Sequence, residues 1–162
     1  MKLQIKQIPP SKNSFYFLVT FSIYFAFQFV TAVIANYFNP ELTESGFQSS
    51  SLLEELVAVV IVAPVLETII FQFIIIEALL KLKLETLPCI IISALLFGVS
   101  HWYNLAYVGV ATVVGFVFAY YYLALRHQRN YNKLTLVILL HALSNLFVFI
   151  EKNFTEILKQ FS

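Results

Sequence analysis

Residues 52–80 read LLEELVAVVIVAPVLETIIFQFIIIEALL, and this stretch decides the class of fold. About 20 consecutive apolar residues cross the hydrocarbon core of a bilayer as one helix, and this run is longer than that. Between residues 56 and 76, Glu67 is the single charged residue. The stretch therefore predicts a transmembrane helix. Pro64 predicts a bend within it, because proline removes a backbone hydrogen bond.

The composition of the whole chain agrees with that interpretation. The residue types A, V, I, L, M, F, W, Y and C make up 60% of the 162 residues and D, E, K and R only 12%, with a mean hydropathy of +0.82. A soluble domain averages about 45–50% apolar and about 25% charged residues, so it could not hide this much apolar surface. We predict an all-α integral membrane protein, a bundle of about five transmembrane helices in a single domain, residues 1–162. The predicted spans are residues 15–38, 52–80, 87–102, 105–125 and 134–150.

Charged residues are distributed unevenly among the predicted connections. The N-terminal segment and the connections at residues 81–86 and 126–133 are basic, and the connection at residues 39–51 is acidic. Five spans put the basic segments on one side, and the positive-inside rule then places the N-terminus in the cytoplasm and the C-terminus outside. We expect a multi-pass protein of the cell membrane, with lipid as its partner. Nucleic acid is not an expected partner, because the formal net charge is +1 and no long basic run occurs.

Few ionisable side chains lie deep inside the predicted spans: Glu67, His101 and His141. A charged side chain at the membrane centre costs about 2.5–3.5 kcal/mol on insertion scales, so such residues mark functional sites. At about 1.5 Å per residue, Glu67 and His101 lie roughly 20 Å, and His141 roughly 10 Å, from the cytoplasmic ends of their spans. Three helices thus bring a carboxylate and two imidazoles toward one interior cavity.

Other polar residues of the spans have structural explanations. Glu77 is followed four residues later by Lys81, a spacing that favours an ion pair on one helix face. Glu54 and Glu55 lie at the outer end of their span, where we expect them to be solvated. We expect Gln28 to form a packing hydrogen bond within the bundle.

Three short motifs contain the deep ionisable residues, each in its own predicted span. Residues 63–72 read APVLETIIFQ, residues 97–101 read FGVSH, and residues 141–145 read HALSN, with Asn104 after the second motif. In this order they resemble the motifs of the CPBP intramembrane proteases, a family named for CAAX proteases and bacteriocin-processing enzymes. The family's motifs are Ala-Pro-x-x-Glu-Glu-x-x-x-Arg, Phe-x-x-x-His and His-x-x-x-Asn. The resemblance covers residues 53–149.

The resemblance implies a peptidase site with four catalytic residues. Peptide hydrolysis needs an activated water and hydrogen-bond donors to the carbonyl oxygen. By the resemblance, Glu67 and His101 together activate the water. His141 and Asn145 then stabilise the tetrahedral oxyanion.

Two positions of the first motif depart from the family pattern. The family's second Glu is Thr68 here, and its Arg is Gln72. In the family this Glu and Arg are interpreted as a supporting pair, and replacing a buried ion pair by a neutral pair is often close to neutral for stability. We therefore assign a supporting role to Thr68 and Gln72. Phe97 of the second motif and Asn104 after it are placed in the same set of substrate-binding or supporting residues.

A zinc site is the alternative chemistry. Glu67, His101 and His141 with one water make a four-coordinate zinc site, and the family is often labelled a metalloprotease group. Glu67 would then be a ligand, no other general base is evident, and the two histidines lack the His-Glu-x-x-His arrangement. We therefore favour a glutamate mechanism without a metal, and keep zinc as the alternative cofactor.

The predicted function is an intramembrane endopeptidase that acts on a membrane-associated peptide or a lipidated protein. Family members cleave prenylated C-terminal peptides in some cases, whereas others process or resist peptide toxins, and the sequence does not select between them. An inactive membrane binding or immunity protein is the second hypothesis, supported by Thr68 and Gln72. A small transporter with Glu67 and the histidines as a proton relay is the third.

Overall fold

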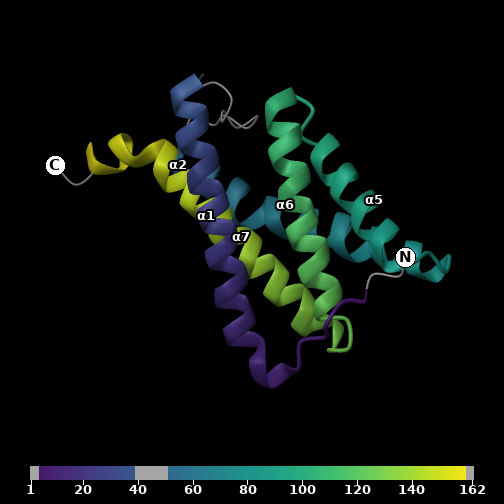
Figure 1. Ribbon diagram of the computed structural model, residues 1–162. Helices are drawn as coiled ribbons and strands as arrows, with labels where there is room; N and C mark the ends of the chain where they lie inside the picture. The colour runs from purple at the N-terminus through teal and green to yellow at the C-terminus, as the bar shows by residue number, and fades with distance from the viewer. Residues whose placement is uncertain (1–3, 39–50, 160–162) are drawn as a thin grey trace.

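The structure is a computed structural model, and it describes residues 4–38 and 51–159. Within these residues the chain forms five helices and no strand, which confirms the predicted all-α bundle (Figure 1). The elements are η1 (Pro10–Lys12), α1 (Asn13–Phe38), α2 (Leu52–Leu56), η3 (Val57–Val62), α3 (Ala63–Glu67), η4 (Thr68–Ile75), α4 (Ile76–Lys81), α5 (Thr86–Val99), α6 (Leu105–Ala124) and α7 (Asn130–Lys159). The elements α2 to α4 are consecutive stretches of one continuous helix, named here the Glu67 helix.

Four helices are long and apolar enough to cross a membrane, over Pro10–Ile34, Leu52–Lys81, Leu105–Ala124 and Asn132–Phe154. The exception among the five is α5, which has 14 residues. At about 1.5 Å per residue it is about 21 Å long, shorter than the hydrocarbon core of about 30 Å. The predicted third span is therefore a shorter helix that ends before His101 and leaves this residue in the turn that follows.

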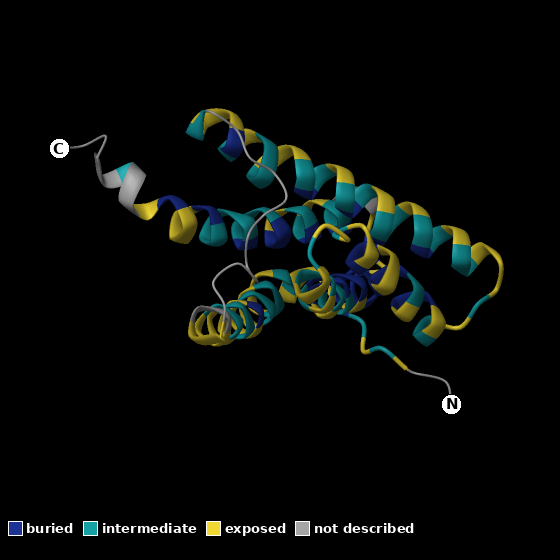
Figure 2. Cartoon of the chain, turned by 90° about the horizontal axis from the view of Figure 1, so that it is seen from above, coloured by how far each residue is buried: buried dark blue, intermediate teal, exposed yellow. Residues whose placement is uncertain are grey.

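The outer faces of the helices are apolar, as a lipid environment requires. Figure 2 shows exposed residues along the outward sides of the helices and buried residues where the helices face one another. On α1, the side chains of Leu18, Ile23 and Phe29 are all more than half exposed. Contiguous apolar exposure of this kind would aggregate in water, whereas lipid accepts it.

The turn between α5 and α6 is fixed at both sides. Asn104 caps α6, because its side-chain oxygen accepts hydrogen bonds from the backbone N–H of Ala106 (3.0 Å) and of Tyr107 (3.2 Å). These are donors that the first helical turn would otherwise leave unpaired. Gly115 lets α6 approach α5 closely, since a Cβ atom there would lie 2.9 Å from the Cα atom of Ala94. The hairpin thus holds His101 in a defined place.

The Glu67 helix changes its hydrogen-bond register around Pro64. The N–H of Ala63 donates to the carbonyl of Ala58, five residues back, which is the π-helical pattern. In this register the next carbonyl, that of Val59, would face Pro64, which has no N–H. The side-chain amide of Asn145 donates to the Val59 carbonyl instead, at 2.8 Å. Pro64 thus leaves the Val59 carbonyl without a partner in its own helix, and α7 supplies the hydrogen-bond donor.

The last helix is longer than predicted. The predicted fifth span ends at residue 150, whereas α7 continues to Lys159. No Gly or Pro interrupts residues 151–159, and several good helix formers occur there. The helix consequently continues beyond the apolar stretch that defined the predicted span.

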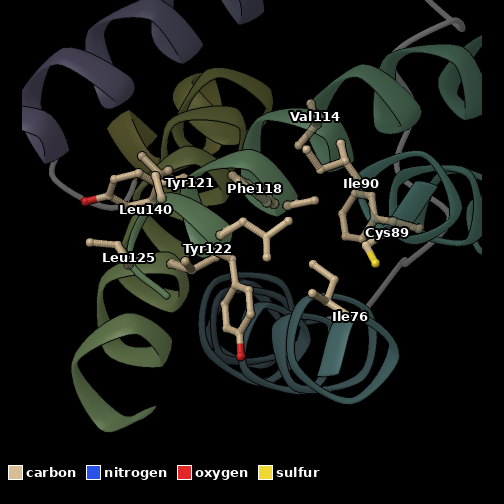
Figure 3. Packing of buried hydrophobic residues seen from close by; sticks show 14 of the residues in the cluster. Ile76, Cys89, Ile90, Val114, Phe118, Tyr121, Tyr122, Leu125 and Leu140 are labelled. Atoms are coloured by element: carbon tan, nitrogen blue, oxygen red, sulfur yellow. The ribbon is translucent and has the colours of Figure 1, made fainter. Parts of the chain in front are cut away.

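A packed core fills one end of the bundle, and Figure 3 shows some of its side chains from close by. Its fully buried side chains come from α4, α5, α6, the residue after α6, and α7, and include Ile76, Cys89, Tyr122, Leu123, Leu125, Val137 and Leu140. The N-terminal segment crosses this end, where the N–H of Ile8 donates to the carbonyl of Ala124 at 2.8 Å. Gln128 donates to the carbonyl of Ile8 at 2.9 Å. We call this end of the bundle the sealed end.

Candidate active site

A cavity of about 370 Å³ lies among α1, the Glu67 helix, α6, α7 and the turn after α5. Glu67, His101, His141 and Asn145 all line it. The structure thus brings together the four side chains that sequence reasoning placed in one catalytic set. A volume of this size is at the low end of the usual range of ligand sites, about 300–1,000 Å³.

Glu67 and His141 face one another across this cavity. Their closest atoms, Glu67 Oε2 and His141 Nε2, are 3.6 Å apart, and the His141 side chain is 4% exposed. This distance exceeds the usual hydrogen-bond length of about 2.7–3.2 Å. On its other side, His141 Nδ1 lies 3.5 Å from the hydroxyl of Thr68. A carboxylate and a hydroxyl one residue apart therefore face the two nitrogens of one imidazole.

His101 is oriented by its own helix turn. Its Nδ1 lies 2.8 Å from the backbone carbonyl of Phe97 and 3.2 Å from the hydroxyl of Ser100. Because a carbonyl can only accept, Nδ1 carries the hydrogen in this contact, and Nε2 of the neutral ring is left as an acceptor. The Phe97 ring packs between the two histidines, with centroids 5.0 Å from His101 and 5.7 Å from His141. Phe97 thus sets the orientation of His101 and spaces both rings.

Asn145 shares its helix face with His141 and lines the same cavity. One hydrogen of its amide is used by the Val59 carbonyl. An amide nitrogen carries two hydrogens, so a second donor remains. Asn145 therefore joins α7 to the Glu67 helix and still has a donor beside the site.

A model of the family described as type II CAAX prenyl endopeptidase Rce1-like matches residues 49–147. The match covers more than half of the chain and includes all three motifs. The chain belongs to the Rce1-like family. Searches of curated proteins and of solved structures found no match.

Membership in the Rce1-like family confirms the resemblance that the three motifs indicated. The family is one of CAAX-type membrane proteases, so the chain has a protease fold and is a multi-pass membrane protein. The matched segment contains the Glu67 helix, α5, α6 and the first part of α7, whereas α1 lies before it.

The two positions that depart from the family motif occupy different environments. Thr68 and Gln72 are each 0% exposed. Thr68 contacts His141, whereas neither amide atom of Gln72 has a hydrogen-bond partner within the described part of the chain. The two residues are therefore not a bonded pair. Gln72 lies one helical turn after Thr68, further from Glu67 along the helix axis, and it does not line the cavity.

The zinc alternative requires Glu67, His101 and His141 to converge on one ion. Over residues 4–38 and 51–159, no group of three His, Cys, Asp or Glu side chains is placed to hold a metal ion. The bond of His101 Nδ1 to the Phe97 carbonyl leaves Nε2 as the possible ligand atom, which is usual for a metal-bound histidine, so this bond does not argue against zinc. As placed, the three side chains do not fit a common ion, and no step below is assigned to a metal.

Sequence reasoning missed the contribution of α1 to the cavity wall, which Tyr24 and Gln28 make. The Gln28 amide donates to the Tyr24 hydroxyl at 2.7 Å, and that hydroxyl also hydrogen-bonds with the Ser144 side chain on α7. The Tyr24 ring stacks on Phe118, at 5.7 Å between centroids. Gln28 does form the predicted hydrogen bond, but it does so in the cavity wall. Two polar residues four apart in an apolar span were the available signal.

The expectation that Glu55 is solvated was wrong. Glu55 is not solvated: its side chain is 8% exposed and its Oε1 is 2.8 Å from Nζ of Lys152, and both residues line the cavity. Glu54, its neighbour, is exposed as predicted. The sequence misses Lys152 as the partner because it is contributed by a distant helix.

Glu77 forms an ion pair, but its partner is Lys133 and not the expected Lys81. Glu77 is bonded to Nζ of Lys133 at 2.8 Å and accepts a hydrogen bond from the Tyr122 hydroxyl at 2.7 Å. The Lys133 ammonium also lies 4.6 Å from the centre of the Tyr122 ring. A buried lysine on the facing helix meets the carboxylate, whereas Lys81 is exposed. This cluster joins α4, α6 and α7 near the sealed end.

Proposed function

We propose that the protein is an intramembrane endopeptidase that hydrolyses a peptide bond of a membrane-associated substrate with water activated at Glu67. The observation that carries the proposal is the meeting of Glu67, His101 and His141 at one cavity inside the bundle, with Glu67 Oε2 3.6 Å from His141 Nε2. Family membership supports the general reaction. We place the protein in the cell membrane, with its N-terminus in the cytoplasm.

The hydrogen bonds of the two histidines support different roles for them. His101 presents Nε2 as an acceptor, because Nδ1–H donates to the Phe97 carbonyl. In His141, a hydroxyl hydrogen donated by Thr68 to Nδ1 would put the ring hydrogen on Nε2, which faces the cavity. One imidazole then accepts a hydrogen bond and the other donates one. Thr68 fixes the donor form of His141 in this proposal.

Hydrolysis then proceeds by proton transfer through the carboxylate. Glu67 takes a proton from a water that His101 Nε2 orients, and the water oxygen bonds to the substrate's carbonyl carbon. The carbonyl electron pair moves to oxygen, and His141 Nε2–H and the second amide hydrogen of Asn145 stabilise that charge. The electron pair on the oxyanion then re-forms the carbonyl, the carbon–nitrogen bond breaks, and Glu67 gives its proton to the leaving amine. The products are a carboxylic acid and an amine.

The test compares membrane peptide ends by mass spectrometry in cells that carry the wild type or Glu67→Gln at equal levels. Glu54→Gln is the matched control, since Glu54 is an exposed glutamate on the same helix. We expect a set of peptide ends that is lost in Glu67→Gln and kept in Glu54→Gln. Identical profiles for all three, with equal rescue of any deletion phenotype, would remove the protease proposal and leave a binding protein.

A non-catalytic binding protein is the second candidate. The observation that favours it is the replacement of the family's acidic and basic residues by Thr68 and Gln72. It predicts that Glu67→Gln binds its partner and performs its function as the wild type does. Glu67-dependent peptide ends would exclude it.

A further inference from the structure

We propose that the catalytic cavity opens on the non-cytoplasmic side of the membrane and admits an extended, apolar peptide segment presented from that side. This inference rests on the proposed protease function for its substrate, whereas its statement about sidedness stands on geometry and charge alone. It selects between the two substrate classes that the sequence left open.

The cavity extends from the catalytic residues toward one end of the bundle. Glu67 and His141 line it from the middle of their helices, whereas Glu55, Tyr103 and Lys152 line it from near helix ends or from a turn. Glu55 lies in the first turn of the Glu67 helix, and Tyr103 lies in the turn between α5 and α6. The Glu55–Lys152 ion pair, 2.8 Å between Oε1 and Nζ, lies at this end, which we call the mouth.

The opposite direction is blocked by close packing. Beyond Glu67 the core side chains of the sealed end are fully buried, and they include Ile76, Tyr122, Val137 and Leu140. The N-terminal segment then covers this core, held by the backbone hydrogen bond between Ile8 and Ala124 and by the bonds of Gln128. A peptide that approached from the sealed end would have to displace this core, so entry from that end is blocked.

Basic residues gather at the sealed end. In the described part of the chain, seven Lys and Arg residues belong to the N-terminal segment, the end of α4 with its turn, and the connection from α6 to α7: Lys6, Lys12, Lys81, Lys83, Arg126, Arg129 and Lys133. At the mouth end the corresponding residues are Lys152 and Lys159. These segments meet in the structure, as the hydrogen bonds between Asn13 and Gln128 and between Glu77 and Lys133 demonstrate.

This asymmetry orients the cavity in the membrane. Lys and Arg in short connections remain on the cytoplasmic side, which makes the sealed end cytoplasmic. The mouth then faces the other side. A lipidated C-terminus of a cytoplasmic protein is separated from Glu67 by the packed core.

The depth of the cavity limits the shape of the substrate. Glu55 and Glu67 are 12 residues apart on one helix, or about 18 Å at 1.5 Å per residue. An extended chain covers about 3.3–3.6 Å per residue, so roughly five residues must enter before a bond reaches Glu67. Val59, Ala63 and Val148 line the wall between. The fitting substrate is an extended, apolar segment of an exported or membrane protein, because a folded domain cannot enter a cavity of about 370 Å³.

Sidedness is tested by thiol labelling in the full-length protein. The buried Cys89 is replaced by Ser, and single cysteines are introduced by Trp102→Cys in the α5–α6 turn or Lys81→Cys at the sealed end. Both positions are exposed, Trp102 at 77%. We expect a membrane-impermeant maleimide to label Trp102→Cys in intact cells and Lys81→Cys only after permeabilisation. Labelling of Lys81→Cys in intact cells, or labelling of Trp102→Cys only after permeabilisation, overturns the inference.

The substrate class is tested on the peptide ends that depend on Glu67. We expect these ends to map to non-cytoplasmic segments of exported or membrane proteins. Ends that map to cytoplasmic segments or to lipidated C-termini would overturn the inference and leave the protease function standing. If no end depends on Glu67, the protease function fails and the substrate part fails with it, while the labelling experiment still decides on which side the mouth lies.

Discussion

Gln72 provides a prediction that needs no substrate. Its side chain is 0% exposed, and both amide atoms lack a partner within the described residues. A buried polar group without a hydrogen bond costs about 1–3 kcal/mol. Replacing it by a leucine removes both atoms and keeps a similar shape. We therefore expect Gln72→Leu to stabilise the folded protein by about 1–3 kcal/mol.

Gln128 is the matched control, because it is also buried but is fully engaged. It donates to the Ile8 carbonyl at 2.9 Å and to Asn13 Oδ1 at 2.6 Å, and it accepts from Asn13 Nδ2 at 3.0 Å. At about 0.5–1.5 kcal/mol for each bond, Gln128→Leu is expected to destabilise the protein by roughly 1.5–4.5 kcal/mol. The same substitution at two buried glutamines thus has opposite signs.

The assay is thermal unfolding of purified protein in detergent micelles, followed by near-ultraviolet circular dichroism or by the fraction that remains monodisperse after heating. For a chain of this size, 1 kcal/mol corresponds to a shift of about 2–4 °C in Tm. We expect Gln72→Leu above the wild type and Gln128→Leu below it. A Tm for Gln72→Leu below that of the wild type would refute the reasoning, because it would mean that the Gln72 amide is satisfied in the folded protein.

Three further predictions concern the site. Thr68→Val is expected to slow Glu67-dependent cleavage about 2- to 12-fold, because it removes one hydrogen bond of about 0.5–1.5 kcal/mol to His141. Thr68→Ser keeps a hydroxyl and is expected to restore the rate. Equal rates for both variants would exclude a role for the hydroxyl. Tyr24→Phe is expected to lower Tm by several degrees through the lost bonds to Gln28 and Ser144, and an unchanged Tm would argue against that link between α1 and α7. A zinc chelator is expected to leave cleavage unchanged; loss of cleavage together with one zinc ion per purified chain would favour the metal alternative.

Much of the membrane architecture could be predicted from local patterns. The run at residues 52–80 and its counterparts predicted the helices because the length of an apolar run is a local property that bilayer thickness interprets directly. The two predictions that failed in extent, the third span and the end of α7, concern helix ends. In both cases the residue at which the helix ends differs from the residue at which the apolar stretch ends.

The site could be predicted where its chemistry is conspicuous within a span. Glu67, His101 and His141 stood out because charged or ionisable side chains are costly in lipid. Tyr24 was missed, since a tyrosine in an apolar helix has many ordinary packing roles. Glu55 was misjudged because its partner, Lys152, is 97 residues away in the chain.

The order of residues is enough to predict a membrane-embedded helical bundle with three family motifs on separate helices, because apolar run length and motif spacing are properties of the chain alone. Only the tertiary packing shows which helix faces meet and which residues line the cavity. It also decided which carboxylates are paired and that α1 completes the cavity wall. The physical reason is that helices that are apolar on nearly all sides carry little signal about their rotation. Their mutual orientation is set by packing contacts such as that of Gly115 against Ala94 and by hydrogen bonds between helices such as that of Asn145 to Val59.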